Sequence, residues 1–354
     1  MTNDKFHSSL ATRHLSLVTC HLISPGSPGF FMQSHPRIVF FGTPDFAVPS
    51  LERLADAGFP VVAVVTAPDR PSGRGLKMAI SPVKACALAR NIPVLQPVNM
   101  KEPAFLQELA GYVPDLQIVI AFRMMPRTVW SLPRLGTFNL HASLLPQYRG
   151  AAPIHRAVMN GESETGVTTF FLNDRIDEGK ILLTEKTAIG PDETAGELHD
   201  RLMVIGAELV LRTVEGIISG GVSEVPQEEM IVSASDLKTA PKLFREDARI
   251  DWTRPVGELY NFIRGLSPHP GAYAPFTLAD GTTADIRILR ARAESAAHDL
   301  VPGGVVTDGK EVFKVAGKGG FIHPEVVQMP GRKAMSQADF LRGYARLFSE
   351  TRDI

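Results

Sequence analysis

Apolar and polar positions follow two different rhythms along this chain. Up to about residue 219, short runs that are almost entirely apolar, such as residues 61–66 and 116–122, alternate with stretches of helical spacing. Such runs are typical of strands that are covered on both faces, and strands that alternate with helices are typical of a parallel sheet. The pattern therefore predicts an α/β domain at residues 37–219, with a Rossmann-like, mostly parallel sheet.

Capping residues and turns define the elements of this first domain. Ser81 is expected to begin one helix and Thr194 a long amphipathic one, because both side chains can accept a hydrogen bond from a backbone amide at a helix N-terminus. The other predicted elements are a helix at residues 46–57 and strands at residues 38–41, 138–141, 166–172 and 181–189.

The pattern changes after residue 219. Gly220 and Gly221 begin a polar stretch that is predicted to be a linker at residues 220–240. Beyond it, short strand-like runs recur between turn signals, as in AYAPFTLADGTTADIRIL, and GKGG at residues 317–320 is predicted to be a hairpin turn. This pattern predicts a smaller C-terminal domain at residues 241–354, an antiparallel, OB-like β-barrel.

The first 36 residues belong to neither domain. They have no sustained hydrophobic period and contain a Ser/Pro/Gly cluster, so we expect an extension that is disordered or, with translation beginning at Met32, a mis-started one. Their low content of acidic residues mildly resembles a transit peptide, which leaves targeting as the alternative. The expected location is cytoplasmic, or an organelle if the extension is a transit peptide.

Composition excludes several classes of protein. The apolar runs are far shorter than the ~20 residues of a membrane helix, so no membrane contact is expected. The two cysteines, Cys20 and Cys86, lack CxxC and Cys/His spacing, so neither a disulfide framework nor a metal site is expected. The net charge of −1 argues against a general nucleic-acid coat. A polyanion would bind at local basic patches, mainly in the slightly basic part from Lys238 onward.

The usual nucleotide-binding motifs are missing from the sequence. The turn after the first strand reads FGTPDF, which has one glycine where a dinucleotide fingerprint needs three. No GxxxxGK[ST] loop occurs either. The sequence therefore argues against an NAD-type site and shows no machinery for nucleotide hydrolysis.

The stretch FNLHASLLPQYRGAAPI contains the best candidates for chemistry. If residues 138–141 form a strand, its two-residue period places Asn139 and His141 on the same face, at the carboxyl end where open α/β sheets bind ligands. Asn139 offers an uncharged N–H donor, and His141 can donate or accept near neutral pH. An Asn-x-His pair can equally be structural, because any strand can carry one.

Such a pair suits acyl transfer to an amine. The carbonyl oxygen gains charge in the tetrahedral intermediate, and two converging donors supply stabilisation of about 3–4 kcal/mol. The attacking nitrogen must also lose a proton. Asp177, in the DRIDEGK loop between two predicted strands, can orient the imidazole and relay that proton through water. We therefore predict a catalytic set of Asn139, His141 and Asp177.

Longer stretches of the chain resemble a known family. NLHASLLPQYRGAAPI followed by GVTTFFLNDRIDEGKIL is similar to the active-site sequence of the folate-dependent formyltransferases. The stretches FGTPDFAVPSL, APDRPSGRGLKM, EDARIDW, IRGLSPHPGAY, PGRKAM and DFLRGYAR also occur in the family's order, between Arg37 and Phe348. Ordered matches over two domains are far more specific than a single motif. Within the family, the match is closest to the enzymes that formylate charged initiator tRNA.

The resemblance implies what the site binds. Asn139, His141 and Asp177 match the family's catalytic Asn, His and Asp, and the implied donor is 10-formyltetrahydrofolate, with no metal. For Met124 and Met125 of the implied folate site, plain core packing remains the alternative. That site comprises Phe122, Arg123, Met124 and Met125 against the pterin, and Ser143, Leu144, Leu145 and Pro146 beside it.

The implied acceptor is the initiator methionyl-tRNA. The loop at residues 67–78 carries Arg70, Arg74 and Lys77, and the resemblance implies that it enters the acceptor stem. On charge alone, a solvated loop is the alternative. The second domain is implied to extend the tRNA contact through Lys238, Lys242, Arg245, Arg249, Arg332 and Lys333.

Two other functions remain open. The first keeps formyl transfer but changes the acceptor to an amino sugar or another small amine, and the basic loop argues against it. The second is a catalytically silent RNA-binding module, which would bind no folate. His155 can support the site, although a surface or capping role is favoured, and no chemistry is predicted for His199, His269 and His323. We expect a monomer.

Overall fold

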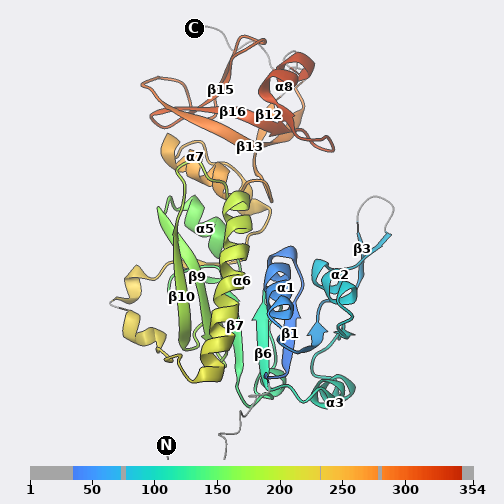
Figure 1. Cartoon of the computed structure of the whole chain (residues 1–354). Helices are drawn as coiled ribbons and strands as arrows, with labels where there is room; N and C mark the ends of the chain where they lie inside the picture. Colours follow the sequence, from blue (N-terminus) through green and yellow to red (C-terminus); the bar gives the residue numbers. More distant parts are fainter. Residues whose placement is uncertain (1–34, 73–76, 232, 278–280, 345–354) are drawn as a thin grey trace, which may run out of the picture. The chain divides into compact units, whose positions relative to one another are not determined.

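A seven-stranded sheet forms the framework of the first half of the chain, in the order β10-β9-β7-β6-β1-β2-β5 (Figure 1). The computed structural model describes residues 35–72, 77–231, 233–277 and 281–344, so the predicted extension lies outside the described residues except for its end. The strands of the sheet are β1 (Ile38–Gly42), β2 (Val61–Val65), β5 (Val94–Leu95), β6 (Leu116–Ile120), β7 (Thr137–His141), β9 (Glu164–Phe171) and β10 (Ile181–Ala188).

The sheet is mostly parallel, as the sequence predicts. β5, β2, β1, β6 and β7 all run in one direction. β9 is antiparallel to β7, and β10 is antiparallel to β9. A loop without a crossover helix joins β9 to β10, and such a direct connection joins neighbouring strands in antiparallel fashion.

Helices cover both faces of the sheet because its strands are apolar on both sides. Ile38 and Phe40 belong to a core formed with α1 and α6, which lie side by side in Figure 1, while Val39 and Phe41 belong to a second core formed with α3 and α4. Among the residues that the structure describes, no helix has the length and apolar character of a membrane span. The helices of this half are α1 (Val48–Asp56), α2 (Pro82–Ala89), α3 (Pro103–Gly111), α4 (Arg127–Trp130), α5 (Pro153–Met159) and α6 (Ala195–Ser219).

Hydrogen bonds confirm the two helix starts that the sequence predicts. The Ser81 hydroxyl accepts from the Lys84 amide at 3.1 Å at the start of α2. At the start of α6, the Thr194 hydroxyl accepts from the Glu197 amide at 3.2 Å, and the Glu197 carboxylate accepts from the Thr194 amide at 2.8 Å. This reciprocal pair is a capping box. α6 ends at Ser219 and is capped by Gly220, whose φ of +68° is left-handed and favours glycine.

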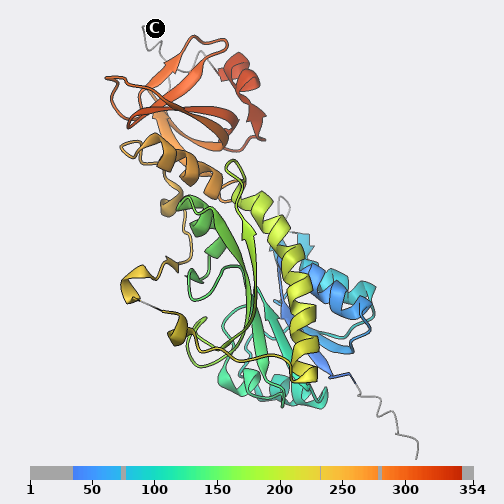
Figure 2. The same cartoon turned by 60° about the vertical axis from the view of Figure 1, so that its left-hand side comes forward.

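A second hydrophobic core lies within the C-terminal half. Its strands form an antiparallel sheet in the order β12-β13-β16-β15-β14, which curls into a half-barrel (Figure 2). Among the described residues the pairing path stays open between β14 and β12, so the predicted barrel is not closed by backbone hydrogen bonds. The elements are α7 (Val256–Gly265), β12 (Ala272–Thr277), β13 (Thr283–Ser295), β14 (Val305–Thr307), β15 (Phe313–Gly317), β16 (Gly320–Gln328), β17 (Met335–Ser336) and α8 (Gln337–Tyr344).

The GKGG stretch is a hairpin turn, as predicted. Gly317 of β15 pairs with Gly320 of β16, and Gly319 between them has a φ of +77°. Only glycine adopts such a conformation without strain, which explains its place in this tight turn.

The segment between the two halves packs on the first half. The composition of residues 220–240 predicts a linker, but Val225 exchanges backbone hydrogen bonds of 2.8 and 2.9 Å with Ile181. Farther along, β11 (Thr239–Ala240) pairs in parallel with β8 (Arg149–Gly150). Composition does not show this packing, because these contacts are made by backbone groups. Short 3-10 helices precede β11 and follow it: η2 (Gln227–Met230), η3 (Ala234–Asp236) and η4 (Glu246–Ala248).

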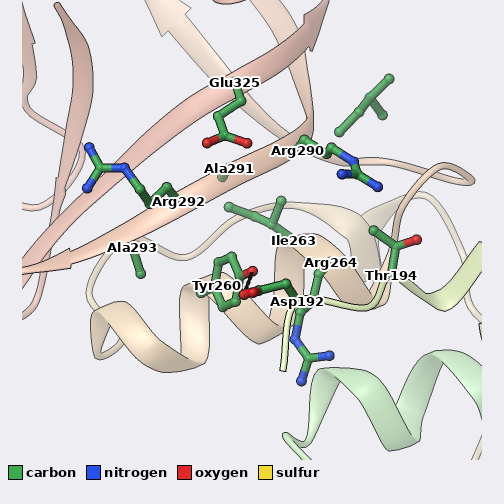
Figure 3. A pocket seen from close by; sticks show the side chains of 11 residues that line it. Asp192, Thr194, Tyr260, Ile263, Arg264, Arg290, Ala291, Arg292, Ala293 and Glu325 are labelled. Carbon is green, nitrogen blue, oxygen red and sulfur yellow. Dashed lines mark hydrogen bonds between the residues drawn. The ribbon is translucent and has the colours of Figure 1, made fainter. Parts of the chain in front are cut away.

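A cavity of about 450 Å³ lies where α7 and β13 meet the loop before α6 (Figure 3). Within it, the Tyr260 hydroxyl donates to Asp192 at 2.6 Å, and burial together with this carboxylate raises the pKa of Tyr260 to about 12. Arg264, which also lines the cavity, donates to the Glu193 carbonyl oxygen at 2.9 Å. These contacts tie α7 to the first half within one compact unit. None of the predicted catalytic residues lines the cavity.

Low pH is expected to weaken this junction through His155. Its Nε2 lies 3.1 Å from the His269 carbonyl oxygen, and burial lowers the pKa of His155, with nearby His199 and Arg156 adding to the effect. A histidine whose pKa is lower in the folded state costs stability as pH falls through its unfolded value of about 6.5. We therefore expect the loss of Tm between pH 7.5 and 5.5 to be smaller in His155→Gln than in the wild type, as measured by calorimetry. Equal losses would contradict this role.

Candidate active site

The side chains of β7 alternate between the two faces of the sheet. Phe138 and Leu140 belong to the core under α6, where Gly206 leaves room for the Leu140 side chain. Asn139 and His141 therefore face the other side together, as their spacing predicts. His141 is the last residue of the strand, at its carboxyl end.

His141 is held by one ring nitrogen, and its other ring nitrogen lies beside Asp177. The residue is 6% exposed, and Nε2 lies 2.9 Å from the carbonyl oxygen of Tyr148. Since a carbonyl oxygen only accepts, Nε2 carries a proton and donates it. Nδ1 lies 3.9 Å from Oδ2 of Asp177. That distance exceeds a hydrogen bond, so Nδ1 keeps its hydrogen-bonding capacity beside a carboxylate.

Asp177 reaches His141 from a loop that crosses the face of the sheet. The loop begins beside the amino end of β7, where the Leu172 amide donates to the Thr137 carbonyl oxygen at 2.8 Å. It then returns toward His141, at the other end of the strand. Asp177 has a φ of +55°, and its Oδ2 accepts from the Gly150 amide at 2.9 Å. The structure thus brings Asp177 and His141 together over the face that also carries Asn139.

Asn139 has an amide group that the protein leaves unused. The residue is half-buried, and its side chain makes no hydrogen bond to any residue that the structure describes. Asn139 is not among the residues with buried, unpartnered side-chain atoms, so its amide remains open to solvent and to a ligand. Its N–H donor is therefore available on the same face as the imidazole.

The residues that hold the set in place were missed from the sequence. Tyr148 is 5% exposed, and Asn160 donates to its hydroxyl at 3.0 Å while that hydroxyl donates to Glu162. Burial raises the pKa of the Tyr148 hydroxyl. The contacts of this hydroxyl hold Tyr148 in place, and its carbonyl oxygen in turn accepts from the imidazole of His141. Gln227, from the predicted linker, is fully buried and contacts the Asp177 loop. Nothing in the sequence indicated Gln227, since a glutamine in a polar stretch is normally exposed.

The segment after β6, predicted to face the pterin, divides between core and surface. Phe122 is half-buried, and its ring meets Phe41 edge-on at 5.6 Å. Met125 is 8% exposed and belongs to the core, as the core-packing alternative expects. Met124 is 74% exposed, so that alternative does not fit it. Arg123 donates to two backbone carbonyl groups after β5. The apolar groups open to a ligand here are those of Met124 and Phe122.

The turn after β7 is fixed by hydrogen bonds to β9. The Ser143 hydroxyl donates to a backbone carbonyl within the turn at 2.6 Å. The Thr168 hydroxyl donates to the Ser143 carbonyl oxygen at 2.7 Å and lies 3.2 Å from the Leu145 amide, which donates to it. Ser143, Leu145 and Pro146 are buried, and Leu144 is half-buried. The turn therefore forms a fixed wall beside β7, and its contact with folate stays a prediction.

The basic loop predicted to contact tRNA has an ordered base. β3 (Arg70–Ser72) and β4 (Lys77–Ala79) form a two-stranded antiparallel ribbon (Figure 1). Arg70 is exposed on this ribbon. Arg74 lies outside the described residues, as does the side chain of Lys77. The prediction of a flexible loop missed the ribbon, because strands this short leave little trace in the hydrophobic pattern.

Asp69 anchors the ribbon to the sheet domain. Its carboxylate accepts from Lys84 at 2.5 Å and from Gln96 at 2.8 Å. These two hydrogen bonds, first that of Lys84, hold the pKa of Asp69 below its ordinary value. The ribbon is thereby tied to α2 and to the end of β5.

Several of the other predicted tRNA contacts have partners within the chain. Lys238 pairs with Glu162, and Arg245 pairs with Asp285 at 2.7 Å. Lys242 lies over the ring of Phe244 at 5.4 Å. The remaining residues of the predicted set are exposed: Arg249, Arg332 and Lys333.

The other histidines lie away from the candidate site. His199 contacts the ring of Phe46 at 5.1 Å, and His323 pairs with Glu294. His155 contacts the His269 backbone carbonyl group at the junction with the second half. In the described part of the chain, no three His, Cys, Asp or Glu side chains gather as metal ligands do.

Comparison with known proteins identifies relatives of both halves. The family model Formyl transferase matches residues 36–214, and the model of its C-terminal domain matches residues 242–345. The methionyl-tRNA formyltransferase of Bacteroides fragilis is 49% identical over 308 residues, which are 87% of this chain and 95% of the relative. That of Phocaeicola vulgatus is 51% identical over 309 residues, with the same coverage of each chain.

The fold is also similar to that of solved structures. The N-formyltransferase from Helicobacter canadensis, in complex with folinic acid and dTDP-3-aminofucose, has a TM-score of 0.58 and 18% identity, and the match covers 83% of this chain and 99% of that one. At that identity the likeness shows the fold alone. In contrast, the matches to the family models and to the relatives of 49% and 51% identity extend over nearly all of the described residues. The chain therefore belongs to the formyl transferase family.

Proposed function

We propose that this chain transfers the formyl group of 10-formyltetrahydrofolate to the α-amino group of methionine on initiator tRNA, and so supports translation initiation. The proposal rests on the approach of His141 and Asp177 on the face that carries Asn139. It is supported by relatives named methionyl-tRNA formyltransferase, whose sequences this chain matches over 95% of their length.

These side chains suit the attack of an amine on a formyl carbon. Negative charge that develops on the formyl oxygen would be stabilised by the Asn139 amide and by a proton on Nδ1 of His141. The Asp177 carboxylate lies 3.9 Å from that nitrogen, with its negative charge beside the imidazole. Through one water molecule, it can also accept the proton that the attacking amine loses. In this scheme, the protein contributes the orientation of the three side chains and the negative charge of Asp177.

The surroundings of the set fit a folate donor. The unpaired amide of Asn139 can bind a polar group of the ligand, and the exposed side chain of Met124 can cover a flat heterocycle. We assign the pterin side to residues 122–125 and the adjoining wall to residues 143–146. When bound, 10-formyltetrahydrofolate supplies a formyl group on a nitrogen that leaves after the amine has attacked and that takes up the proton the amine has lost.

The distribution of basic residues supports tRNA as the acceptor. We assign the catalytic domain to residues 37–219, the connecting segment to residues 220–240 and the tRNA-binding domain to residues 241–354. Arg70, Arg74 and Lys77 would contact the acceptor stem of the tRNA. The exposed basic residues of the second domain would contact the remainder of the tRNA. All of the assigned residues come from one chain, so a monomer suffices, and we assign its action to the cytoplasm.

An acceptor comparison tests the proposal. Incubation with 10-formyltetrahydrofolate and charged initiator tRNA is expected to give formylmethionyl-tRNA, while free methionine and an amino-sugar nucleotide give no product. The product is measured by separating formylated from unformylated methionyl-tRNA. Formylation of the sugar but not of the tRNA would contradict the proposal and support the alternative acceptor.

A further inference from the structure

Gln227 is a buried polar side chain in the segment between the two halves. It has 0% exposure, and its amide uses all of its hydrogen-bonding capacity. Oε1 accepts from Nε and Nη2 of Arg149 at 3.0 and 2.7 Å. Nε2 donates to the carbonyl oxygens of Asp177 and Gly179 at 2.9 and 2.8 Å. A primary amide has two acceptor and two donor sites, so this side chain is fully satisfied by the Arg149 guanidinium and the backbone of the Asp177 loop.

These bonds join the two segments that hold the catalytic groups. Arg149 lies between Tyr148, whose carbonyl oxygen accepts from the catalytic imidazole, and Gly150, whose amide donates to the catalytic carboxylate. Residues 177–179 carry that carboxylate. Gln227 therefore connects the segment that holds the imidazole to the loop that holds the carboxylate.

The Asp177 backbone needs such an anchor. Its φ of +55° is left-handed, a conformation that costs a residue with a side chain about 1–2 kcal/mol. The three residues before it, 174–176, are exposed, so they offer the loop few contacts. On the other side, Glu178 approaches Arg149 at 3.3 Å, and Gln227 binds the same arginine. Without the amide, the loop can relax and its carboxylate can move away from the imidazole.

We propose that Gln227 is a positioning residue for formyl transfer, which sets the separation of Asp177 and His141 without touching the substrate. This inference rests on the proposed function, in which the Asp177 carboxylate acts beside the His141 imidazole. It gives the segment between the two halves a direct part in the geometry of the active site. Gln227 acts entirely through the groups that it holds.

Two variants remove different parts of the Gln227 contact. Gln227→Glu keeps an acceptor for Arg149 and removes both donors to the Asp177 loop, whereas Gln227→Met removes all four bonds. A displacement of about 1 Å in a catalytic group lowers rates by about 10²-fold, so we expect kcat for formylation of methionyl-tRNA to fall by about that factor in Gln227→Glu. The KM values for folate and tRNA are expected to stay unchanged. Circular dichroism checks the fold, and Gln227→Glu decides the outcome if Gln227→Met does not fold.

Gln147→Met is the matched control. Gln147 also joins the first half to the connecting segment, because its Oε1 accepts from the Lys238 amide at 2.8 Å and its Nε2 donates to the Asp236 carbonyl oxygen at 3.2 Å. It makes no hydrogen bond to the Asp177 loop. Its kcat is expected to stay within about threefold of the wild type, as for a substitution away from the catalytic groups.

A double-mutant cycle distinguishes positioning from a general structural role. In an Asp177→Asn background, Gln227→Glu should cost less than about threefold in kcat, since the carboxylate that it positions is already gone. A loss as large as in the wild-type background would overturn the inference, and so would wild-type kcat in Gln227→Glu alone. Full activity of Asp177→Asn would overturn the site assignment as well, whereas a wild-type chain that does not formylate methionyl-tRNA would refute the proposed function itself.

Discussion

Asn139→Ala is expected to lower kcat for formylation of methionyl-tRNA by about 10²–10³-fold, because one preorganised donor to a developing oxyanion contributes that much. The half-buried amide makes no hydrogen bond within the described chain, so its removal leaves no partner unsatisfied. Thermal stability is therefore expected to change little. Steady-state kinetics with charged initiator tRNA and a thermal unfolding curve measure the two effects separately.

Asn139→Asp is the control for shape. The carboxylate occupies nearly the same volume as the amide but has no N–H to donate when ionised. We expect a loss of kcat at least as large as that of the alanine variant. If both variants keep kcat within about threefold of the wild type, Asn139 does not stabilise the oxyanion and its unpaired amide needs another explanation.

Asp177→Asn is expected to lower kcat by about 10²–10⁴-fold, the range over which a positioned acid or base contributes. The substitution keeps an oxygen that can accept from the Gly150 amide, so the loop should keep its place. It removes the negative charge 3.9 Å from Nδ1 of His141 and the acceptor for the proton of the attacking amine. Single-turnover measurements at saturating folate and tRNA report this loss directly.

Asp174→Asn serves as the control for charge in the same loop. Its carboxylate is 66% exposed and lies 3.5 Å from Arg127 on the surface, and such exposed pairs contribute little. Near-wild-type kcat is expected. Equal losses in Asp174→Asn and Asp177→Asn would mean that the net charge of the loop matters, and not the place of Asp177 beside the imidazole.

The position of the site on the sheet explains how distant parts of the chain come to share one task. Asn139 and His141 are presented by β7, while Asp177 is brought across the sheet face by the loop between β9 and β10. The segment that follows α6 then passes back over this loop, where Gln227 binds it. A chain cut after α6 would keep the predicted catalytic residues and lose one of the contacts that hold them.

Local patterns were enough to predict many of the elements and the shared face of Asn139 and His141. Ser81 and Thr194 begin helices because their hydroxyl groups satisfy free amides within the next turn, which depends only on neighbouring residues. Asn139 and His141 share a face because side chains alternate along any strand. Gly319 forms a hairpin turn for an equally local reason. The two-part order of strands and helices followed from the same periodicities.

Only the tertiary structure decided which distant groups meet. The antiparallel direction of β9, the open path of the C-terminal sheet and the packing of residues 220–240 all depend on backbone hydrogen bonds between remote segments. The burial of Gln227 and the left-handed backbone of Asp177 also depend on contacts between remote segments. A residue's type and spacing determine its local geometry, but a contact across the fold exists only where packing has brought both partners together, and no local pattern records it.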